Sequence, residues 1–466
     1  MKKSHRSAIH PGVKTKGGEP VARSKPILIR DVLHKLFSTA FLMELATSTG
    51  AVRRVRQLDI VAFFWTLVFG FALGRERTIA GLRRAYEKTT GHTIEESSFY
   101  NRFNDGLVAM LKSAAAHAFD TSVGLGRALQ GPLASFKDVL LTDSTVVRLH
   151  EMLAKTFPAC RTNHTKAALK AHVMLSVRGE GKQSIRVTSE RAHDGPVLRV
   201  GKWLKDRLLV FDLGYFSYNL FARIQKNGGY FLTRLKLSAN PTIVAVNRVS
   251  RGQCIDLLGE RVHDIMGQLH REILDVVVDV RFARRRYAGR SRRDWQSLRV
   301  VGIRAPQPGR YYLYITNIPP EMLSAEDIQS TYALRWQIEL LFKELKSTYR
   351  LEDMPSRKRA VVEALLYATI LTFLVSRRLL AELRRRRANL AKRAPLQRWA
   401  TVLESVAPEL LMIMTRPLHE LKPLIRRIHT ILLHEARDPN AKRLPLLNAV
   451  ENRTHRYRGF SAGIQA

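Results

Sequence analysis

Two aspartates end apolar segments that have the composition of β-strands. Asp143 lies in the sequence VLLTDST and Asp212 lies in LLVFDLG. A buried carboxylate is costly unless it is paired or binds a cation. Carboxylates at the ends of adjacent strands can converge on a hard cation such as Mg²⁺, which prefers oxygen ligands. Asp143 taken alone is equally consistent with a turn-forming role, because Asp side chains often hydrogen-bond to nearby backbone.

A second polar group lies in the segment 332–346, YALRWQIELLFKELK, which has the period of an amphipathic helix. Its apolar stripe would pack on a sheet and consists of Leu334, Ile338, Leu341 and Leu345. Beside this stripe, within an arc of about 60°, lie Tyr332, Arg335, Glu339 and Lys346. A carboxylate framed by two cations and a tyrosine can hold a metal ion and offer phosphate-binding donors. The alternative is a solvated face with one Arg335–Glu339 ion pair, worth a few tenths of a kcal/mol.

The spacing Y-x2-R-x3-E-x6-K resembles the YREK signature of a large group of bacterial insertion-sequence transposases of the DDE type. Two further stretches are similar to that family: LLTDST resembles its first-Asp strand, and VFDLGYFS its D-x-G-[YF] motif. The run from YLYITNI to FKELKS resembles the family's passage from the last strand into the catalytic helix. The resemblance spans residues 136 to about 375.

The resemblance implies an α/β fold with an RNase H-like catalytic core, in which Asp143, Asp212 and Glu339 form the catalytic triad. The triad would hold two Mg²⁺ ions, with Mn²⁺ as a substitute, about 3.5–4 Å apart. The metals would then generate the nucleophile, so no catalytic His or Cys is expected. The long connection from Asp212 to Glu339 predicts a β-rich insertion, as in this family. Tyr332, Arg335 and Lys346 would contact transposon-end DNA near the scissile phosphate.

Additional DNA contacts are expected from the sequence RFARRRYAGRSRRDW at positions 281–295. Its arginines, Arg284, Arg285 and Arg286 among them, suit a loop that follows phosphates rather than one that reads bases. Trp295 is a candidate by position for stacking an extruded base, as in hairpin-forming relatives, and the alternative is packing against the inserted sheet. Closer to the triad in sequence, three residues are either phosphate contacts or ordinary surface positions: Lys166, Lys170 and His172.

The whole chain is strongly basic. Its 466 residues include 78 Lys and Arg against 40 Asp and Glu, a formal net charge of +38. Such a surplus repels itself unless a polyanion is near, so double-stranded DNA is the first partner to consider and an anionic membrane surface the second. The two cysteines exclude a disulfide framework and suit a reducing cytosol. The amino-terminal sequence has no apolar signal region, and a cytoplasmic, nucleoid-associated protein is expected.

The apolar runs 60–73 and 364–375 are shorter than the roughly 20 residues that span a bilayer, and we expect buried helices rather than membrane contact. Five regions are predicted: a disordered basic arm (1–30), a helical DNA-binding domain (31–125), the catalytic core (130–235 and 317–375), the β-rich insertion (236–316) and a helical basic carboxy-terminal region (376–466).

Within the first helical region, residues 78–111 predict a helix, a turn at Gly91 and a second helix that is capped near Ser97 or Ser98. A helix-turn-helix would place Arg102 in a DNA groove. The alternative is a helical hairpin in the core, with Phe99 and Phe103 as packing residues.

Three functions fit these features. The first is an active transposase that works as a homodimer on the inverted repeats of its own element and on target DNA. The second is a non-catalytic, domesticated transposase that binds DNA. The third is an RNase H-like nuclease without strand transfer. The complete set of acidic and YREK residues favours the first.

Overall fold

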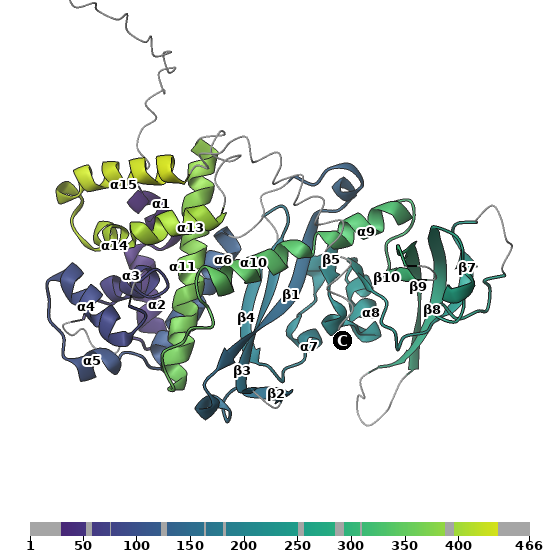
Figure 1. The fold of residues 1–466 in the computed structure, drawn as a ribbon, viewed down its shortest axis with the longest axis horizontal. Coiled ribbons are helices and arrows are strands. Elements are labelled where there is room, and N and C mark those ends of the chain that lie inside the picture. The colour runs from purple at the N-terminus through teal and green to yellow at the C-terminus, as the bar shows by residue number, and fades with distance from the viewer. Residues whose placement is uncertain are drawn as a thin grey trace, which may run out of the picture.

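The computed structural model describes residues 29–52, 58–74, 76–122, 128–162, 165–179, 183–249, 256–284, 293–307, 310–386 and 396–436. Within these residues the molecule is elongated, with a helical body at one end and a long sheet that extends from the middle to the other end (Figure 1). The fold is therefore mixed α/β, as predicted. Nearly all of the predicted basic arm, residues 1–28, lies outside the described residues.

The central part of the sheet is built around β1 (Asp138–Leu149). This strand is antiparallel to β3 (Thr165–Ser176), which also pairs with β2 (Pro158–Thr162) and β4 (Ser184–Ser189). On its other side β1 is parallel to β5 (Arg207–Phe211), and β5 is parallel to β6 (Tyr230–Arg234). β5 is almost wholly buried, as expected for an apolar strand with both faces covered.

The inserted strands continue the same sheet. β6 pairs with β10 (Tyr311–Thr316), followed in order by β9 (Arg293–Arg304), β8 (Ile273–Ala283) and β7 (Thr242–Val246). The β-rich segment predicted as an insertion thus extends the central sheet, and the described residues form ten strands in one sheet. The helix α8 (Tyr218–Lys226) contacts both β6 and β8, which joins the two parts.

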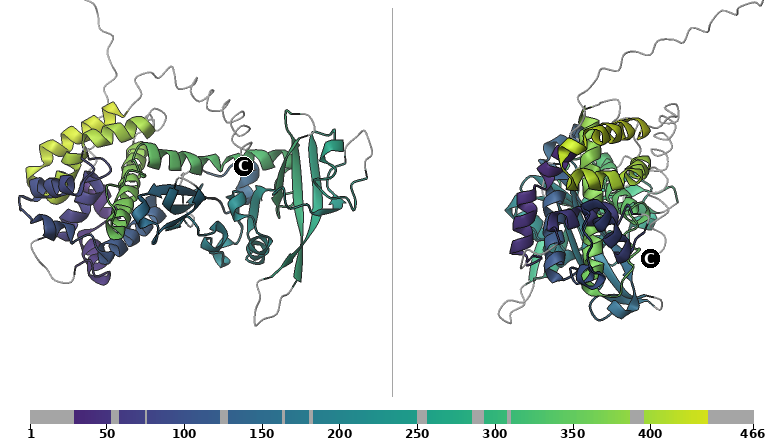
Figure 2. Two further views of the ribbon diagram at one scale, coloured as in Figure 1. Left: turned by 60° about the horizontal axis from the view of Figure 1, so that its bottom comes forward. Right: turned by 90° about the vertical axis from the view of Figure 1, so that its left-hand side faces the viewer.

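Two helices cross the sheet and carry the predicted YREK residues. α9 (Ala325–Ala333) contacts β6, β8 and β9, and α10 (Trp336–Ser347) contacts β1 (Figure 2). The apolar stripe expected from the sequence packs inward, with Ile338, Leu341 and Leu345 almost completely buried. The predicted single helix over 332–346 is wrong in one respect, because it is interrupted at Leu334–Arg335.

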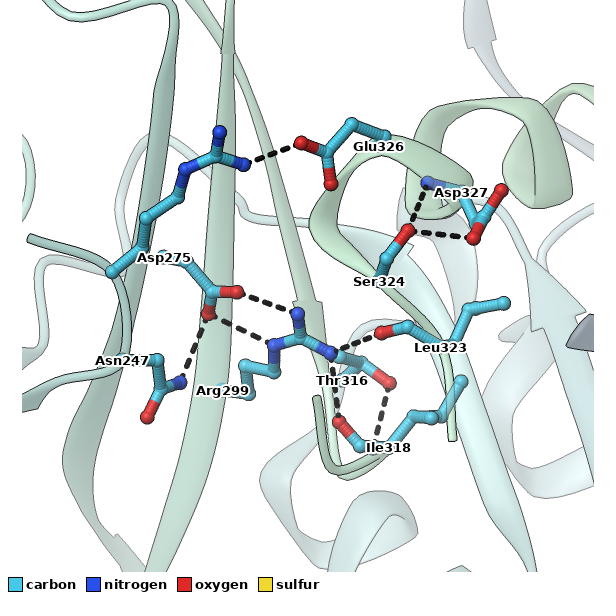
Figure 3. Close-up of polar contacts among 10 residues, drawn as sticks. Asn247, Asp275, Arg299, Thr316, Ile318, Leu323, Ser324, Glu326 and Asp327 are labelled. Atoms are coloured by element: carbon cyan, nitrogen blue, oxygen red, sulfur yellow. Dashed lines mark hydrogen bonds and ion pairs between the residues drawn. The ribbon is translucent and has the colours of Figure 1, made fainter. Parts of the chain in front are cut away.

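A buried ion pair attaches the inserted strands to the start of α9 (Figure 3). Arg299 on β9 and Asp275 on β8 are 4% and 5% exposed, and Arg299 Nη2 lies 2.6 Å from Asp275 Oδ2. Arg299 Nη1 also donates to the carbonyls of Ile318, over 3.3 Å, and Leu323, over 2.7 Å. Both carbonyls belong to the loop that leads into α9, where Ser324 caps the helix. The insertion therefore fixes the point at which α9 begins.

The helical body combines both ends of the described chain. Its amino-terminal helices are α1 (Ile29–Leu36), α2 (Thr39–Ser48), α3 (Ile60–Gly70), α4 (Ile79–Thr90), α5 (Glu96–Tyr100) and α6 (Asp105–Ser122). Its carboxy-terminal helices are α11 (Arg359–Arg386), α13 (Leu396–Ser405), α14 (Ala407–Thr415) and α15 (Lys422–Glu435). α11 contacts α1, α3 and α6, and α14 contacts α3 and α4. The described parts of the regions 31–125 and 376–466, which were separated in the sequence-based division, therefore share one core.

The two long apolar runs are buried helices, as predicted. α3 is eleven residues long, and nine of them are buried. α11 is long and apolar enough by length and composition to cross a membrane, but 83% of its apolar window is buried inside the structure. Thr372 of α11 donates to the Val68 carbonyl of α3 over 2.5 Å, which ties the two helices together.

The predicted helix-turn-helix differs from what the structure contains. α4 ends at Gly91 with a φ of 76°, as expected for a glycine cap, but α5 begins after Glu95 and has only five residues. Phe99 and Phe103 pack edge-on against Phe63, with ring centroids 5.2 and 5.8 Å apart, which confirms the packing alternative. A recognition helix that continues through residue 111 is therefore wrong.

Candidate active site

The sheet register brings the two predicted aspartates together. β1 and β5 are parallel neighbours in which Thr142 is paired with Phe211, so Asp143 and Asp212 occupy the next position on adjacent strands. Asp143 is not at a strand end, because β1 continues to Leu149, whereas Asp212 does follow the last residue of β5. α10 packs on β1 and supplies Glu339. The three predicted acidic residues therefore converge from three elements.

Arg335 joins two of the three carboxylates. Its Nη1 lies 2.8 Å from Asp143 Oδ2, and its Nη2 lies 2.5 Å from Glu339 Oε1. The predicted Arg335–Glu339 ion pair is present, but the Arg335 side chain is only 19% exposed, so the pair does not lie on a solvated face. The hydroxyl of Tyr332 donates to Asp212 Oδ1 over 3.4 Å, and the Arg335 guanidinium lies 5.7 Å from the Tyr332 ring centroid. The predicted arc of Tyr332, Arg335 and Glu339 thus faces both aspartates.

The interruption between α9 and α10 determines how these side chains point. Leu334 and Arg335 keep helical dihedral angles, but the backbone bonds tighten to a three-residue spacing. Arg335 N donates to Tyr332 O and Ile338 N donates to Arg335 O, each over 3.0 Å. Tyr332 is therefore near the end of one helix, while Glu339 is in the first turn of the next.

Burial of Asp143 raises the pKa of its carboxyl group to about 6. The Arg335 guanidinium and the backbone N–H of Ser144 lower this pKa, while the charges of Asp212 and Glu339 raise it. Burial lowers the pKa of Arg335, but the Tyr332 phenol and the carboxylates of Asp143 and Glu339 outweigh that effect, so the net direction is upward. Arg335 is therefore a permanent cation beside an acid that titrates close to neutrality.

The donor set fits a hard divalent cation. The three converging groups are all carboxylates, the ligand type that Mg²⁺ and Mn²⁺ take in proteins. Among the described residues, no three carboxylate, imidazole or thiol groups are arranged so that they could cage a metal as they stand. Arg335 bridges Asp143 and Glu339 instead. Metal binding at these carboxylates therefore requires Arg335 to release at least one of them.

Lys346 lies further along α10, away from the acidic cluster. Its Nζ donates to the Val146 carbonyl of β1 over 2.6 Å and lies 2.7 Å from Glu352 Oε1. Beside it is a cavity of about 430 Å³ that is lined by Val146, Arg148, Thr165, Glu190, Lys346 and Glu352. The fourth YREK residue thus borders a separate hollow next to β1.

The remaining predicted DNA contacts are scattered. Trp295 is 66% exposed on β9, so the alternative in which it packs against the inserted sheet is wrong. Arg284 pairs with Asp294, with Nε 2.6 Å from Oδ2. Arg102 is half-buried in the turn after α5. Arg285 and Arg286 lie outside the described residues.

A second polar cluster lies beside the triad and had no motif in the sequence. Asp194, the first residue of the short helix α7 (Asp194–Val197), accepts a hydrogen bond from Ser144 Oγ over 3.1 Å. The same oxygen, Oδ1, lies 3.4 Å from Lys170 Nζ and 3.2 Å from His172 Nδ1. Lys170 and His172 are 15% and 5% exposed, so they face this carboxylate rather than solvent. Lys166 is exposed and pairs with Glu151.

Comparison with known proteins finds transposases that are similar to this chain. The family model described as "Transposase DDE domain" matches residues 134–375. The chain is 22% identical over 382 residues to the transposase of insertion sequence element IS231E from Bacillus thuringiensis subsp. finitimus, an alignment that covers 74% of this chain and 78% of the relative. It is 21% identical over 325 residues to the transposase of IS1151 from Clostridium perfringens, covering 64% of this chain and 69% of the relative.

A solved structure of the piggyBac transposase synaptic complex with hairpin DNA aligns over 92% of this chain and 90% of its own, with 11% identity and a TM-score of 0.42. The family match places the chain in the DDE transposase family, because it covers more than half of the residues. It is a DNA transposase of the bacterial insertion-sequence type, as the sequence resemblance predicted. The relatives do not favour a non-catalytic DNA-binding protein or a nuclease without strand transfer.

Proposed function

We propose that this transposase binds the terminal inverted repeats of its own insertion sequence and catalyses metal-dependent cleavage and transfer of the DNA strands. The observation that carries this proposal is the convergence of Asp143, Asp212 and Glu339 around Arg335. An RNase H-like core is supported by the strand order β4-β3-β1-β5-β6, in which β3 is antiparallel to β1 while β5 and β6 are parallel to it.

In this proposal Asp143, Asp212 and Glu339 hold two Mg²⁺ ions, for which Mn²⁺ can substitute. Two such ions supply an activated water or DNA 3′-hydroxyl and stabilise the leaving oxygen. Arg335 neutralises Asp143 and Glu339 before the ions bind and then becomes free to donate to a phosphate. Tyr332 holds Asp212 toward the same centre through its hydroxyl. The side chains therefore position and neutralise charge, and they need not accept the proton of the nucleophile.

The DNA contacts that we propose surround this centre. Arg335 and Tyr332 lie in it, and Lys346 lies at the next hollow along β1. Trp295 is free to stack on a base because two thirds of its surface is exposed. Arg102 and the arginines at 284–286 would contact phosphates. The formal charge of +38 supports a large electrostatic share in binding, and hence steep salt dependence.

We further propose that the active form is a homodimer that bridges two transposon ends and that the protein acts in the bacterial cytoplasm, on the nucleoid. The reaction requires two ends to be processed together, which a dimer achieves by symmetry. The basic charge and the two cysteines are compatible with DNA as the partner and a reducing compartment as the location.

The proposal is tested with Asp212→Asn on DNA fragments that carry the sequences flanking the gene. The variant should lose Mg²⁺-dependent cleavage and keep its affinity for the fragments, because the amide preserves the shape but not the charge that holds the metal. Asp206→Asn is the matched control, since Asp206 is exposed and lies immediately before β5, the strand that Asp212 follows. Cleavage of the cognate ends by Asp212→Asn would show that the triad is assigned wrongly.

A further inference from the structure

We propose that Asp194 is a positioning residue of the catalytic site, which fixes Asp143 and Asp212 relative to each other from the opposite face of the sheet. The inference rests on the proposed metal-binding role of those two residues. Asp194 would not bind the metal itself. Its carboxylate instead connects the two strand segments that carry the ligands.

The connection to Asp143 runs through Ser144. The backbone N–H of Ser144 donates to Asp143 Oδ1 over 2.7 Å, and its hydroxyl donates to Asp194 Oδ1 over 3.1 Å. Successive side chains on a strand point to opposite faces, so Asp143 faces α10 while Ser144 points away from it. Asp194 therefore contacts β1 at Ser144, the residue next to Asp143, on the face of the sheet opposite α10.

The connection to Asp212 runs through Gly214, the glycine of the D-x-G-Y motif. A Cβ at Gly214 would lie 2.6 Å from Asp194 Oδ2, a separation that side-chain carbons do not adopt. The φ angle of Gly214 is not in the left-handed region. The glycine is therefore needed for space beside Asp194, and not for a turn that only glycine can make.

Tyr215, which follows Gly214 in the same motif, is a buried residue at this place. It is 2% exposed, and its hydroxyl has no hydrogen-bond partner among the described residues. Burial raises the pKa of Tyr215, and the charges of Asp194, Asp143 and Asp212 raise it further, in that order. Tyr215 is therefore a buried part of the short turn η4 (Leu213–Tyr215), which packs against α7.

The sheet anchors Asp194 firmly enough for this role. Lys170 and His172 lie two residues apart on β3 and both face Asp194, and Ser144 is the cross-strand partner of His172. Lys170 Nζ also donates to the Ala192 carbonyl over 3.3 Å, which fixes the loop before α7. The Asp194 side chain is only 13% exposed, so Lys170 and His172 face this carboxylate and not DNA phosphates.

The first test compares Asp194→Ala and Ser144→Ala with the unmodified full chain. Residues that orient metal ligands typically contribute about 10–100-fold to metal affinity or activity. We expect Asp194→Ala to weaken Mn²⁺ binding, measured by titration without DNA, by about 10–100-fold. Cleavage with Mg²⁺ should fall more than cleavage with Mn²⁺, since Mg²⁺ demands near-ideal octahedral geometry. Ser144→Ala removes one hydrogen bond and should shift both readouts less in the same direction.

Metal-free binding to the flanking DNA and the thermal unfolding midpoint separate positioning from misfolding. A folded Asp194→Ala protein with unchanged Mn²⁺ affinity and an unchanged ratio of Mg²⁺ to Mn²⁺ cleavage would overturn the proposal. If the unmodified protein itself fails to cleave with either metal, the proposed function fails instead, and the two failures are therefore distinguishable.

The second test is a double-mutant cycle between Asp194 and Gly214. Gly214→Ala should reduce Mn²⁺ affinity in the unmodified chain, because the new methyl group meets the Asp194 carboxylate. In the Asp194→Ala background that obstacle is gone, so the same substitution should add almost nothing. Gly195→Ala is the matched control, since a Cβ there meets no atom within 4 Å. If the effects of Asp194→Ala and Gly214→Ala multiply independently, the link between these residues is wrong.

Discussion

The guanidinium of Arg335 lies 2.8 Å from the carboxylate of Asp143, a residue 192 positions earlier in the chain. This contact joins α10 to the centre of the sheet, and the other end of the same guanidinium pairs with Glu339. One cation thus holds two of the proposed metal ligands. A divalent ion at the proposed metal site would therefore compete with Arg335 for these carboxylates.

The competition predicts the behaviour of Arg335→Gln. Loss of the charge-assisted bonds to Asp143 and Glu339 should reduce the free energy of unfolding of the metal-free protein by about 1–3 kcal/mol. Added Mg²⁺ should raise the unfolding midpoint more in the variant than in the unmodified chain, because the carboxylates are already free. Urea unfolding with and without Mg²⁺ measures both effects, and Arg223→Gln on the exposed face of α8 is the control. Equal stabilisation by Mg²⁺ in both proteins would contradict the competition.

Metal binding should depend on pH through Asp143. Its pKa rises from 3.8 to about 6 on folding, so the folded state binds this proton more tightly than the unfolded chain does. The resulting stability is fully present below the unfolded pKa of 3.8 and is lost as the pH rises through about 6. A divalent ion competes with the same proton, so its affinity should fall about tenfold for each pH unit below the folded pKa. Mn²⁺ titrations at several pH values measure the slope of log affinity against pH. If Asp143→Asn leaves this slope unchanged, the proton that competes with the metal is bound by another group.

Lys346 should contribute one phosphate contact. Lys346→Met is expected to weaken binding to the transposon ends and to reduce the slope of log affinity against log salt by about one. Fluorescence anisotropy at several salt concentrations measures that slope. Lys343→Met on the exposed side of α10 is a closely matched control, since it removes the same charge from the same helix. Equal losses in the two variants would indicate a general charge effect in place of a specific contact.

Substitutions in the buried Asp275–Arg299 pair should affect the free energy of unfolding and DNA cleavage to different extents. Arg299→Met leaves Asp275 buried without its partner and should cost about 3–5 kcal/mol of unfolding free energy. The double variant Asp275→Leu/Arg299→Met should recover much of that stability but not cleavage, because the Ile318 and Leu323 carbonyls before α9 still lack their donor. Urea unfolding and end cleavage test this prediction, and full recovery of cleavage in a stable double variant would refute it.

Substitution of Trp295 should lower the affinity for DNA and leave the stability of the fold nearly unchanged. Because 66% of its surface is exposed, Trp295→Ala should change the free energy of unfolding by less than about 0.5 kcal/mol. Stacking on an unpaired base is worth about 1–3 kcal/mol, so affinity for ends with unpaired terminal bases should fall while Trp295→Phe keeps part of it. Full affinity of a folded Trp295→Ala protein for such ends would remove Trp295 from the DNA contacts.

The convergence of Asp143, Asp212 and Glu339 and most of the core strands could be predicted, the strands from local apolar patterns and the convergence from the spaced motifs. Apolar runs that end in Asp143 and Asp212 predict two strands. Helical spacing alone left a solvated face open for Glu339, and its place beside the aspartates was expected only from the resemblance of the spaced motif to the transposase family. The interruption at Leu334–Arg335 gave no such signal, since neither residue breaks helices and both keep helical angles. Its cause is the packing of α9 and α10 on different parts of the sheet.

Long-range pairings account for the other differences. Nothing in β6 or β10 specifies that they pair with each other, and that pairing is what merges the insertion with the core sheet. Asp194 lies in the sequence RAHDGPV, where it has the composition of a loop residue. Only the fold of β1, β3 and η4 (Leu213–Tyr215) around it reveals its partners.

The contact of α14 with α3 and α4 has a consequence for synthesis of the chain. During translation the amino-terminal helices are synthesised long before residues 407–415. The surface of α3 that contacts α14 therefore stays uncovered by α14 through most of translation. The helical body can close only on a chain that is nearly finished. A nascent or prematurely terminated chain would therefore present α3 and α4 without their packing partner α14.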